Sequence, residues 1–241
     1  MDAVPQLQAA ISRFAGLAGA ATGDEPVPAC GGWVVRDLVE HLGAVHRWAA
    51  AIVLSGQRLT RPDPLVTGPV ADWYAGTGAA LLAALAAVSP DEDVPNFSRS
   101  DQKASFWPRR QLHETTVHTI DALQALGVEE AQWGLGADLA ADGVDEVLQV
   151  FFPRLTAGGR RPVVRSRLRL VATDLDRSWV IAPGQGDAGT PVQLHPSLDA
   201  DEIVTGRAAD LYLGLWHRVS RDRLRFEGPD GPALFDGPTT P

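Results

Sequence analysis

Apolar residues recur at helical spacing in four segments of the first half of the chain. The first segment runs from Leu7 to Ala18, and the others cover about residues 34–54, 70–88 and 106–126. Stretches rich in proline and glycine separate these segments, and Gly127 is a natural C-cap for the last one. Four helices of this length joined by moderate loops predict a helical bundle.

The second half of the chain has a different pattern. A helix is expected over Asp142 to Phe152, and the apolar residues of Val163 to Thr173 alternate with arginines at the two-residue period of a half-buried strand. Further strands are expected over residues 179–182, 191–194 and 224–227, with a helix over Thr205 to Val219. The predicted fold class is α+β, with a four-helix domain over residues 1–135 and a small α/β domain over residues 136–241.

Composition narrows the possible partners. The chain has 241 residues, of which 45% are apolar and 21% are charged, as in an ordinary globular protein. Lys and Arg together number 21 against 30 Asp and Glu, so the formal net charge is −9. A surface of this sign repels the phosphate backbone, and we therefore expect no nucleic-acid partner.

The same sequence also indicates where the protein is located and which sulfur chemistry is possible for it. No apolar run approaches the ~18 residues of a membrane span, and the N-terminus has no basic signal-peptide region, so a cytoplasmic protein without a membrane partner is expected. The single cysteine, Cys30, cannot form an internal disulfide or a CxxC pair. Any metal must therefore be held by histidines and carboxylates. Cys30 itself is interpreted as a packing residue, not a nucleophile.

A polar stripe on the fourth predicted helix carries the candidate chemistry. Glu114 and His118 are four residues apart and lie within about 40° on one helix face, with Asp121 three residues further along. His113 and His118 are five apart, so the pair lacks the spacing of the H-E-x-x-H metalloprotease motif. A carboxylate and an imidazole at this spacing can supply two ligands to a divalent metal. The same pair is also common on a solvated helix face.

The second predicted helix offers a third ligand. His41 lies next to the apolar stripe that contains Leu38 and Val45, whereas His46 points more nearly to the opposite side and is interpreted as a surface or packing histidine. A set of two histidines and one glutamate leaves a fourth coordination position open, as in catalytic zinc sites.

Three segments resemble the mycothiol-dependent maleylpyruvate isomerase family: VPACGGWVVRDLVEHL (residues 27–42), FWPRRQLHETTVHTID (106–121) and TGRAADLYLGLWHR (205–218). They occur in the family's order, and the resemblance extends over nearly the whole chain. It implies a DinB-like four-helix metal-binding domain and a smaller α/β C-terminal domain. Val34 departs from the family's Thr or Ser before the second helix, so a weaker N-cap is expected there.

The resemblance also implies a set of site residues. His41, Glu114 and His118 would hold a zinc ion, and Asp121 and an arginine placed at Arg218 would contribute to catalysis. Asp121 and Arg218 could pair across the domain interface, either to close the cleft or as a structural salt bridge. Arg109, Arg110 and Arg218 are candidates to bind an anionic substrate, with a solvated helix start as the alternative for the first two.

The implied reaction uses a low-molecular-weight thiol, mycothiol, as cosubstrate. Zinc would hold the thiol as a thiolate, and the thiolate would add to the cis double bond of a small electrophilic dicarboxylate such as maleylpyruvate. Bond rotation and loss of the thiolate would give the trans isomer, whereas a thiolate that stays attached would make the enzyme an S-transferase. Two alternatives are a non-catalytic metal- or ligand-binding regulatory module and a zinc hydrolase that uses metal-bound water.

Overall fold

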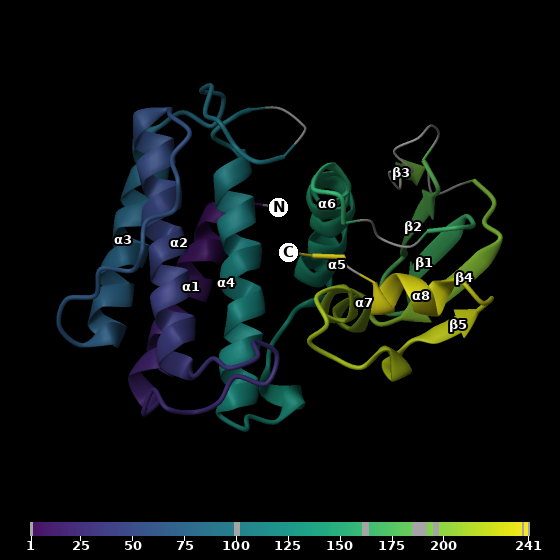
Figure 1. The fold of residues 1–241 in the computed structure, drawn as a ribbon, viewed down its shortest axis with the longest axis horizontal. Helices are drawn as coiled ribbons and strands as arrows, with labels where there is room; N and C mark the ends of the chain where they lie inside the picture. Colours follow the sequence, from purple (N-terminus) through teal and green to yellow (C-terminus); the bar gives the residue numbers. More distant parts are fainter. Residues whose placement is uncertain are drawn as a thin grey trace. The chain divides into compact units, whose positions relative to one another are not determined.

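The computed structural model describes residues 2–98, 102–160, 164–184, 192–194, 198–237 and 239–240. The chain divides into a helical unit of residues 1–96 and 101–133, and an α/β unit of residues 97–100 and 134–241. Figure 1 shows long helices in the first unit and a sheet with short helices in the second. This arrangement confirms the α+β class. Val163 and Pro191, which begin two of the predicted strands, lie outside the described residues.

Four long helices form the helical unit at nearly the predicted positions. They are α1 (Ala3–Ala20), α2 (Val35–Ser55), α3 (Val70–Ala87) and α4 (Phe106–Ala125), followed by the short 3-10 helix η1 (Glu130–Gln132). Helix α2 packs against α3 and α4, and α1 packs against α3 and α4. The close approach of α2 to α3 needs Gly43, because a Cβ there would lie 2.2 Å from the Trp73 ring.

Helix α2 begins without a side-chain cap from Val34, and other groups accept its first backbone N–H groups. Val34 supplies no side-chain hydrogen bond, but its own N–H donates to Asp37 Oδ2 at 2.9 Å. Carbonyls of the preceding loop accept the next two N–H groups, from Val35 to Glu25 and from Arg36 to Gly23. The helix end is therefore satisfied by its loop. After α4, Gly127 adopts φ +66°, as its predicted role requires.

Helix α4 is unusually polar for a buried helix. Fourteen of its 20 residues are buried, and most of these fourteen are polar or charged. Three threonines satisfy their hydroxyls within the helix: Thr115, Thr116 and Thr119 each donate to the carbonyl four residues earlier at 2.7 Å. The remaining buried polar groups must find partners on neighbouring helices or in a bound ligand.

No segment was expected to resemble a membrane span, but helix α3 does so by its length and composition. It has 18 residues with a mean hydropathy of 1.3, so it is long and apolar enough to cross a membrane by these two criteria alone. The helix packs on α1 and α2, and Tyr74, Leu81 and Ala84 lie in the core. A single helix of this kind is weak evidence for a membrane.

The α/β unit is a mixed sheet with helices packed on it. Its helices are α5 (Ala137–Glu146), the π-helical turn η2 (Val147–Phe151), α6 (Phe152–Ala157), α7 (Ala208–Leu215), the 3-10 turn η3 (Arg221–Arg223) and α8 (Gly231–Asp236). Its strands are β1 (Leu168–Ala172), β2 (Arg177–Ala182), β3 (Val192–Leu194), β4 (Glu202–Gly206) and β5 (Arg225–Glu227), in the order β3-β2-β1-β4-β5. Among the strands that the structure describes, β1 and β4 pair in parallel and the other pairs are antiparallel. Helix α7 packs on these two strands and on α5.

The predicted helix over Thr205 to Val219 was wrong at both ends. Thr205 and Gly206 are the last residues of strand β4. This strand pairs with β1, which is distant in sequence. The helix stops at Leu215 because His217 turns to φ +57° and the N–H of Arg218 closes back to the Leu213 carbonyl. Strand β4 and helix α8 were not predicted, and the helix expected from Asp142 begins at Ala137 instead.

Candidate metal centre

Side chains from α2 and α4 converge on one carboxylate oxygen. Glu114 Oε1 lies 3.3 Å from His41 Nε2 and 3.4 Å from His118 Nε2. One ligand atom from each of the three residues lies within 4.8 Å of the others. The helical period places Glu114 and His118 on one face of α4, and the packing of α2 against α4 adds His41.

The carboxylate of Glu114 is held in its charged form. Burial alone would raise its pKa, but the Arg110 charge and hydrogen bonds with His118 and His41 hold the pKa well below its ordinary value. Arg110 forms an ion pair with the second oxygen, Oε2. Arg110 is itself buried beside this carboxylate, and the first oxygen, Oε1, faces the two imidazoles.

The two imidazoles have opposite protonation tendencies. Burial lowers the pKa of His41 below its ordinary value, although the hydrogen bond to Glu114 acts to raise it. Burial also acts to lower the pKa of His118, but the bonds with Asp121 and Glu114 outweigh it and raise the pKa to about 9. Before a metal binds, the lowered pKa favours the neutral form of His41 and the raised pKa favours the protonated form of His118.

Asp121 lies behind His118. Its Oδ2 is 2.9 Å from His118 Nδ1, and the side chain is completely buried. A carboxylate in this place fixes the imidazole orientation and directs Nε2 towards Glu114. The helical spacing predicted that Asp121 shares the stripe of Glu114 and His118, but it did not predict this contact with His118.

The three donors fit a zinc ion. Imidazole nitrogens and a carboxylate oxygen are ligands that zinc accepts, and ligands about 2.1 Å from a tetrahedral ion lie about 3.4 Å apart. The observed separations of 3.3 and 3.4 Å match this spacing. The contact between Asp121 and His118 is the outer-shell support typical of such sites.

Cys30 lies at the edge of the same cluster. Its Sγ is 3.7 Å from Asp121 Oδ2, and it forms a second group of possible ligands with His118 and Asp121. The turn before α2 positions it, because the N–H of Cys30 donates to the Val27 carbonyl. From the sequence, Cys30 was interpreted as a packing side chain in preference to a nucleophile, with no role at the metal site. Its proximity to α4 is a tertiary contact that no local pattern indicates.

The other histidine of α2 lies in the packed core. His46 is fully buried, its Nε2 is 3.1 Å from Thr115 Oγ1, and its ring packs at 5.4 Å from the Tyr74 ring. Burial lowers its pKa to about 3, so the ring is neutral. Of the two environments expected for His46, the surface and the packed core, the structure shows the packed core. His113 is likewise completely buried.

The arginines proposed for an anionic substrate occupy different environments. Arg110 pairs with Glu114, and Arg109 is half-buried near the start of α4. Arg218 belongs to the α/β unit, where its Nη1 donates to the Trp216 carbonyl at 2.7 Å. The predicted pairing of Arg218 with Asp121 involves two separate units and stays a prediction.

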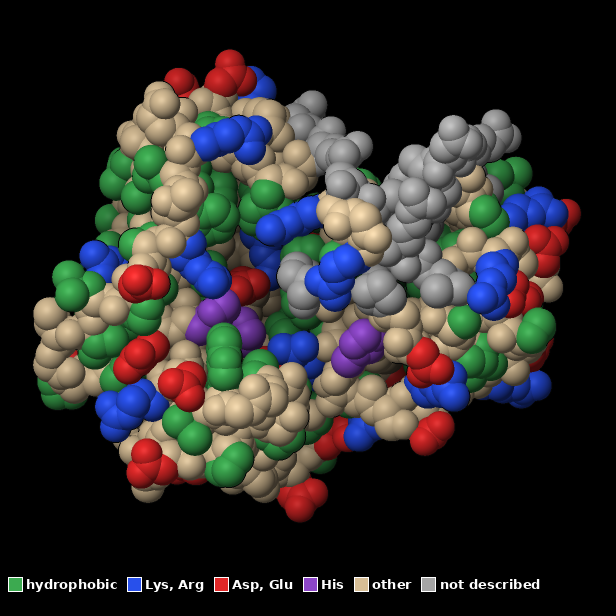
Figure 2. Space-filling view, in the orientation of Figure 1, with side chains coloured by type: hydrophobic (Ala, Val, Ile, Leu, Met, Phe, Trp, Pro, Cys, Tyr) green, Lys and Arg blue, Asp and Glu red, His purple; other side chains and the backbone are tan. Residues whose placement is uncertain are grey.

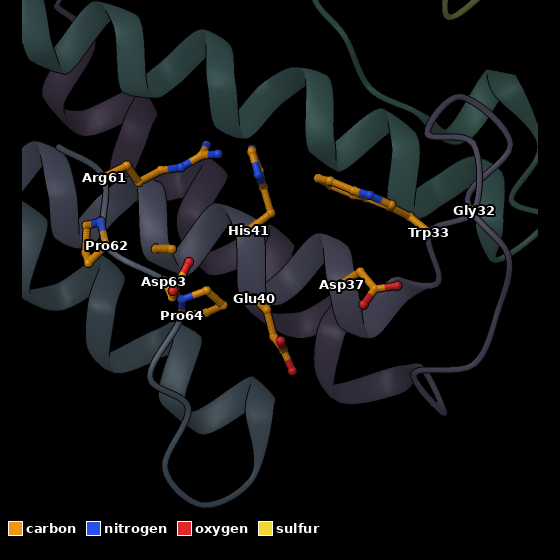
Figure 3. A pocket seen from close by; sticks show the side chains of 10 residues that line it. Gly32, Trp33, Asp37, Glu40, His41, Arg61, Pro62, Asp63 and Pro64 are labelled. Carbon is orange, nitrogen blue, oxygen red and sulfur yellow. The ribbon is translucent and has the colours of Figure 1, made fainter.

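A cavity of about 510 Å³ opens beside His41. Residues from the start of α2 and from the loop between α2 and α3 line it: Gly32, Trp33, Asp37, Glu40, His41, Ala44, Arg61, Pro62, Asp63 and Pro64 (Figure 3). The Trp33 ring lies 5.0 Å from the His41 ring and forms one wall. Figure 2 shows histidine atoms at the surface of the helical unit, among basic and acidic side chains.

The fold and these donors define a class of protein: a helical unit with a candidate two-histidine, one-glutamate metal centre, joined to a small α/β unit. The family model of the mycothiol maleylpyruvate isomerase N-terminal domain matches residues 4–123, and the MDMPI C-terminal domain model matches residues 138–236. The chain therefore belongs to the mycothiol maleylpyruvate isomerase family, as its three motifs predicted.

Two solved structures share the fold over nearly the whole chain. A crystal structure of the mycothiol-dependent maleylpyruvate isomerase has a TM-score of 0.62 at 14% identity. A histidine-to-alanine mutant of that enzyme has a TM-score of 0.65 at 13% identity. Each comparison covers 95% of this chain and 94% of the other. No curated protein matches the sequence.

Proposed function

We propose that this protein is a zinc-dependent enzyme that uses a low-molecular-weight thiol, mycothiol, on a small anionic electrophile. The reaction is either cis-trans isomerisation of a dicarboxylate such as maleylpyruvate or transfer of the thiol to the electrophile. Family membership supports the thiol and the reaction class. The helical unit would be the DinB-like four-helix metal-binding domain, residues 1–135, and residues 136–241 would form the C-terminal domain.

One observation carries the proposal: His41, Glu114 and His118 direct three donor atoms to a common point while Asp121 supports His118 from behind. A partly buried cluster of charged groups is costly unless it is fully paired or holds an ion. Here two imidazoles share one carboxylate oxygen, so a divalent cation would replace the His118 proton and satisfy all three groups.

Zinc, when bound, would lower the pKa of a thiol and keep it as a nucleophilic thiolate at neutral pH. The protein's own residues prepare the site for this ion. Arg110 keeps Glu114 ionised, and Asp121 orients His118. Trp33 and the loop between α2 and α3 provide a cavity beside His41 for a small substrate. Arg218 and Asp121 remain the proposed catalytic residues of the family motif, and a cytoplasmic location fits a small-molecule thiol.

Metal analysis tests the ligand set. The purified protein is expected to contain about one zinc per chain, and His41→Ala and His118→Ala should each lose it. His217→Asn is a matched control, because His217 is exposed in the α/β unit and asparagine tolerates its positive φ. Stoichiometric zinc in both alanine variants would show that the assigned ligands are wrong.

Activity measurements then test the reaction. Isomerisation of maleylpyruvate only when mycothiol is present, or mycothiol-dependent conjugation of monochlorobimane, is the expected result. Hydrolytic activity without any thiol would support a zinc hydrolase instead. Bound zinc without turnover of either substrate would support a regulatory module.

A further inference from the structure

The proposed reaction assigns no role to Arg61, a cationic side chain near the candidate metal site. It lies on the loop between α2 and α3, in the wall of the cavity beside His41. In Figure 3 its guanidinium points towards the His41 ring. Among the residues that the structure describes, Arg61 forms no hydrogen bond or ion pair with another side chain, unlike Arg110 at the same site.

The charges around the cavity give Arg61 a particular role. The other charged residues that line it are acidic: Asp37, Glu40 and Asp63. Asp37 accepts the N–H of Val34 at the start of α2, and in Figure 3 Asp37 and Glu40 extend away from the His41 ring. The positive charge of Arg61 therefore lies beside His41, at the end of the cavity nearest the candidate metal ligands (Figure 3), while the third acid, Asp63, lies two residues further along the same loop. An anionic ligand would be repelled elsewhere and attracted there.

The loop that carries Arg61 is anchored. Trp48 Nε1 donates to the Leu59 carbonyl at 2.7 Å. Arg58 donates to the Asn96 carbonyl at 3.1 Å and to Gln102 Oε1 at 3.0 Å. Pro62 follows Arg61 directly and restricts its backbone to extended conformations. An anchored backbone reduces the entropy that must be lost when the side chain binds a ligand.

We propose that Arg61 binds a carboxylate of the electrophilic substrate and holds the reactive carbon beside the candidate metal site. A planar guanidinium can bind a carboxylate through two parallel hydrogen bonds, which fixes both position and orientation. Arg61 is thus a substrate-binding residue that selects anionic over neutral electrophiles. The inference rests on the proposed function, because it assigns the substrate's charge within that same site.

Binding of maleate, a cis dicarboxylate, to the zinc-loaded protein without thiol tests the inference directly by titration calorimetry. Arg61→Gln is expected to weaken maleate binding at least tenfold while the zinc content stays unchanged. Arg61→Lys should be intermediate, because it keeps the charge and loses the paired hydrogen bonds. Arg13→Gln is the matched control, since it removes the same charge from α1, outside the cavity lining. Maleate affinity that is absent in the wild type, or unchanged in Arg61→Gln, overturns the proposal.

Turnover measurements distinguish a role of Arg61 in substrate selection from a purely structural role. In Arg61→Gln, KM for maleylpyruvate should rise about tenfold or more, whereas mycothiol conjugation of the neutral monochlorobimane should stay within about twofold of wild type. An equal loss with both electrophiles would mean that Arg61 only supports the loop. If the wild type turns over neither compound, the proposed function fails, and the maleate titration still decides the role of Arg61.

Discussion

The two units treat their buried and half-buried carboxylates in different ways. In the α/β unit, Asp145 is bonded to Trp179 Nε1 at 2.8 Å and paired with Arg177. Glu202 in the same unit accepts the backbone N–H groups of residues 230 and 231, at 2.9 and 3.0 Å. In the helical unit, by contrast, one oxygen of Glu114 is shared by two imidazoles.

The difference separates a structural carboxylate from a candidate metal ligand. Asp145 and Glu202 are satisfied by donors of the protein itself and tie strands, helices and turns together. Glu114 is satisfied on one oxygen by Arg110, while its other oxygen faces two rings that can each offer a lone pair to a metal. Burial alone does not identify a functional acid. The kind of partner on each oxygen does.

The largest expected effect distinguishes these two kinds of acid. Glu114→Gln should abolish stoichiometric zinc and reduce thiol-dependent turnover at least a hundredfold, because an amide is a poor zinc ligand. It should also destabilise the protein by about 3 kcal/mol, since the ion pair between Glu114 and the buried Arg110 is lost. Metal analysis and urea unfolding measure the two effects.

Glu202→Gln is the matched substitution in the α/β unit. It should cost about 1–2 kcal/mol by weakening charge-assisted hydrogen bonds to the N–H groups of residues 230 and 231. Zinc per folded chain should not change. If Glu202→Gln loses zinc as completely as Glu114→Gln, the distinction between the two acids is incorrect.

Asp121→Asn should have a smaller effect than loss of Glu114. The amide keeps the volume but no longer fixes the orientation and basicity of His118, so zinc affinity should fall about tenfold to a hundredfold. Competition with a chromophoric chelator measures the change. An unchanged affinity would remove Asp121 from the support of the metal site.

The pH dependence of zinc binding reports on His118. Its pKa is raised to about 9, so below that pH a zinc ion must displace the proton. Zinc affinity should therefore rise about tenfold per pH unit up to about pH 9 and then level off. Without metal, the folding stability depends on pH in the opposite direction. The stabilisation that comes from the raised pKa of His118 is complete below about pH 6.5 and is lost as the pH rises through about 9. Chelator competition and thermal unfolding across this range check both slopes.

The smallest effect is expected at the other histidine of α2. His46→Leu replaces a neutral, fully buried ring with an apolar side chain, while the Thr115 hydroxyl keeps its bond to the Gln111 carbonyl. The free energy of unfolding should change by about 1 kcal/mol or less, and zinc content should not change. Loss of zinc in this variant would extend the metal site beyond the three assigned residues.

The helical unit could be predicted well because its signals are local. The apolar stripes of α1 and α2, the prolines between the helices and Gly127 after α4 all lie within a few turns of the elements they define. Strand β4 could not be predicted in the same way. Its five residues are held by β1, more than thirty positions away, and their pattern also continues into α7. A strand that depends on a distant partner has little signature of its own.

The same division applies to the candidate site. The spacing of Glu114 and His118 places them on one face of a helix wherever that helix lies, and the position of His41 beside an apolar stripe directs it towards a neighbouring helix. Arg61 and Cys30 carry no such spacing. They reach the site through the loop between α2 and α3 and through the turn before α2.

The sequence by itself determined the class of fold, the family and the three candidate ligands, because helical periodicity and motif order are properties of the chain. The tertiary structure decided which buried groups face one another. It directed Arg110 to Glu114, placed Asp121 behind His118, and left Arg61 at the cavity beside His41. These outcomes depend on distances between elements far apart in sequence, and those distances arise only when the helices pack.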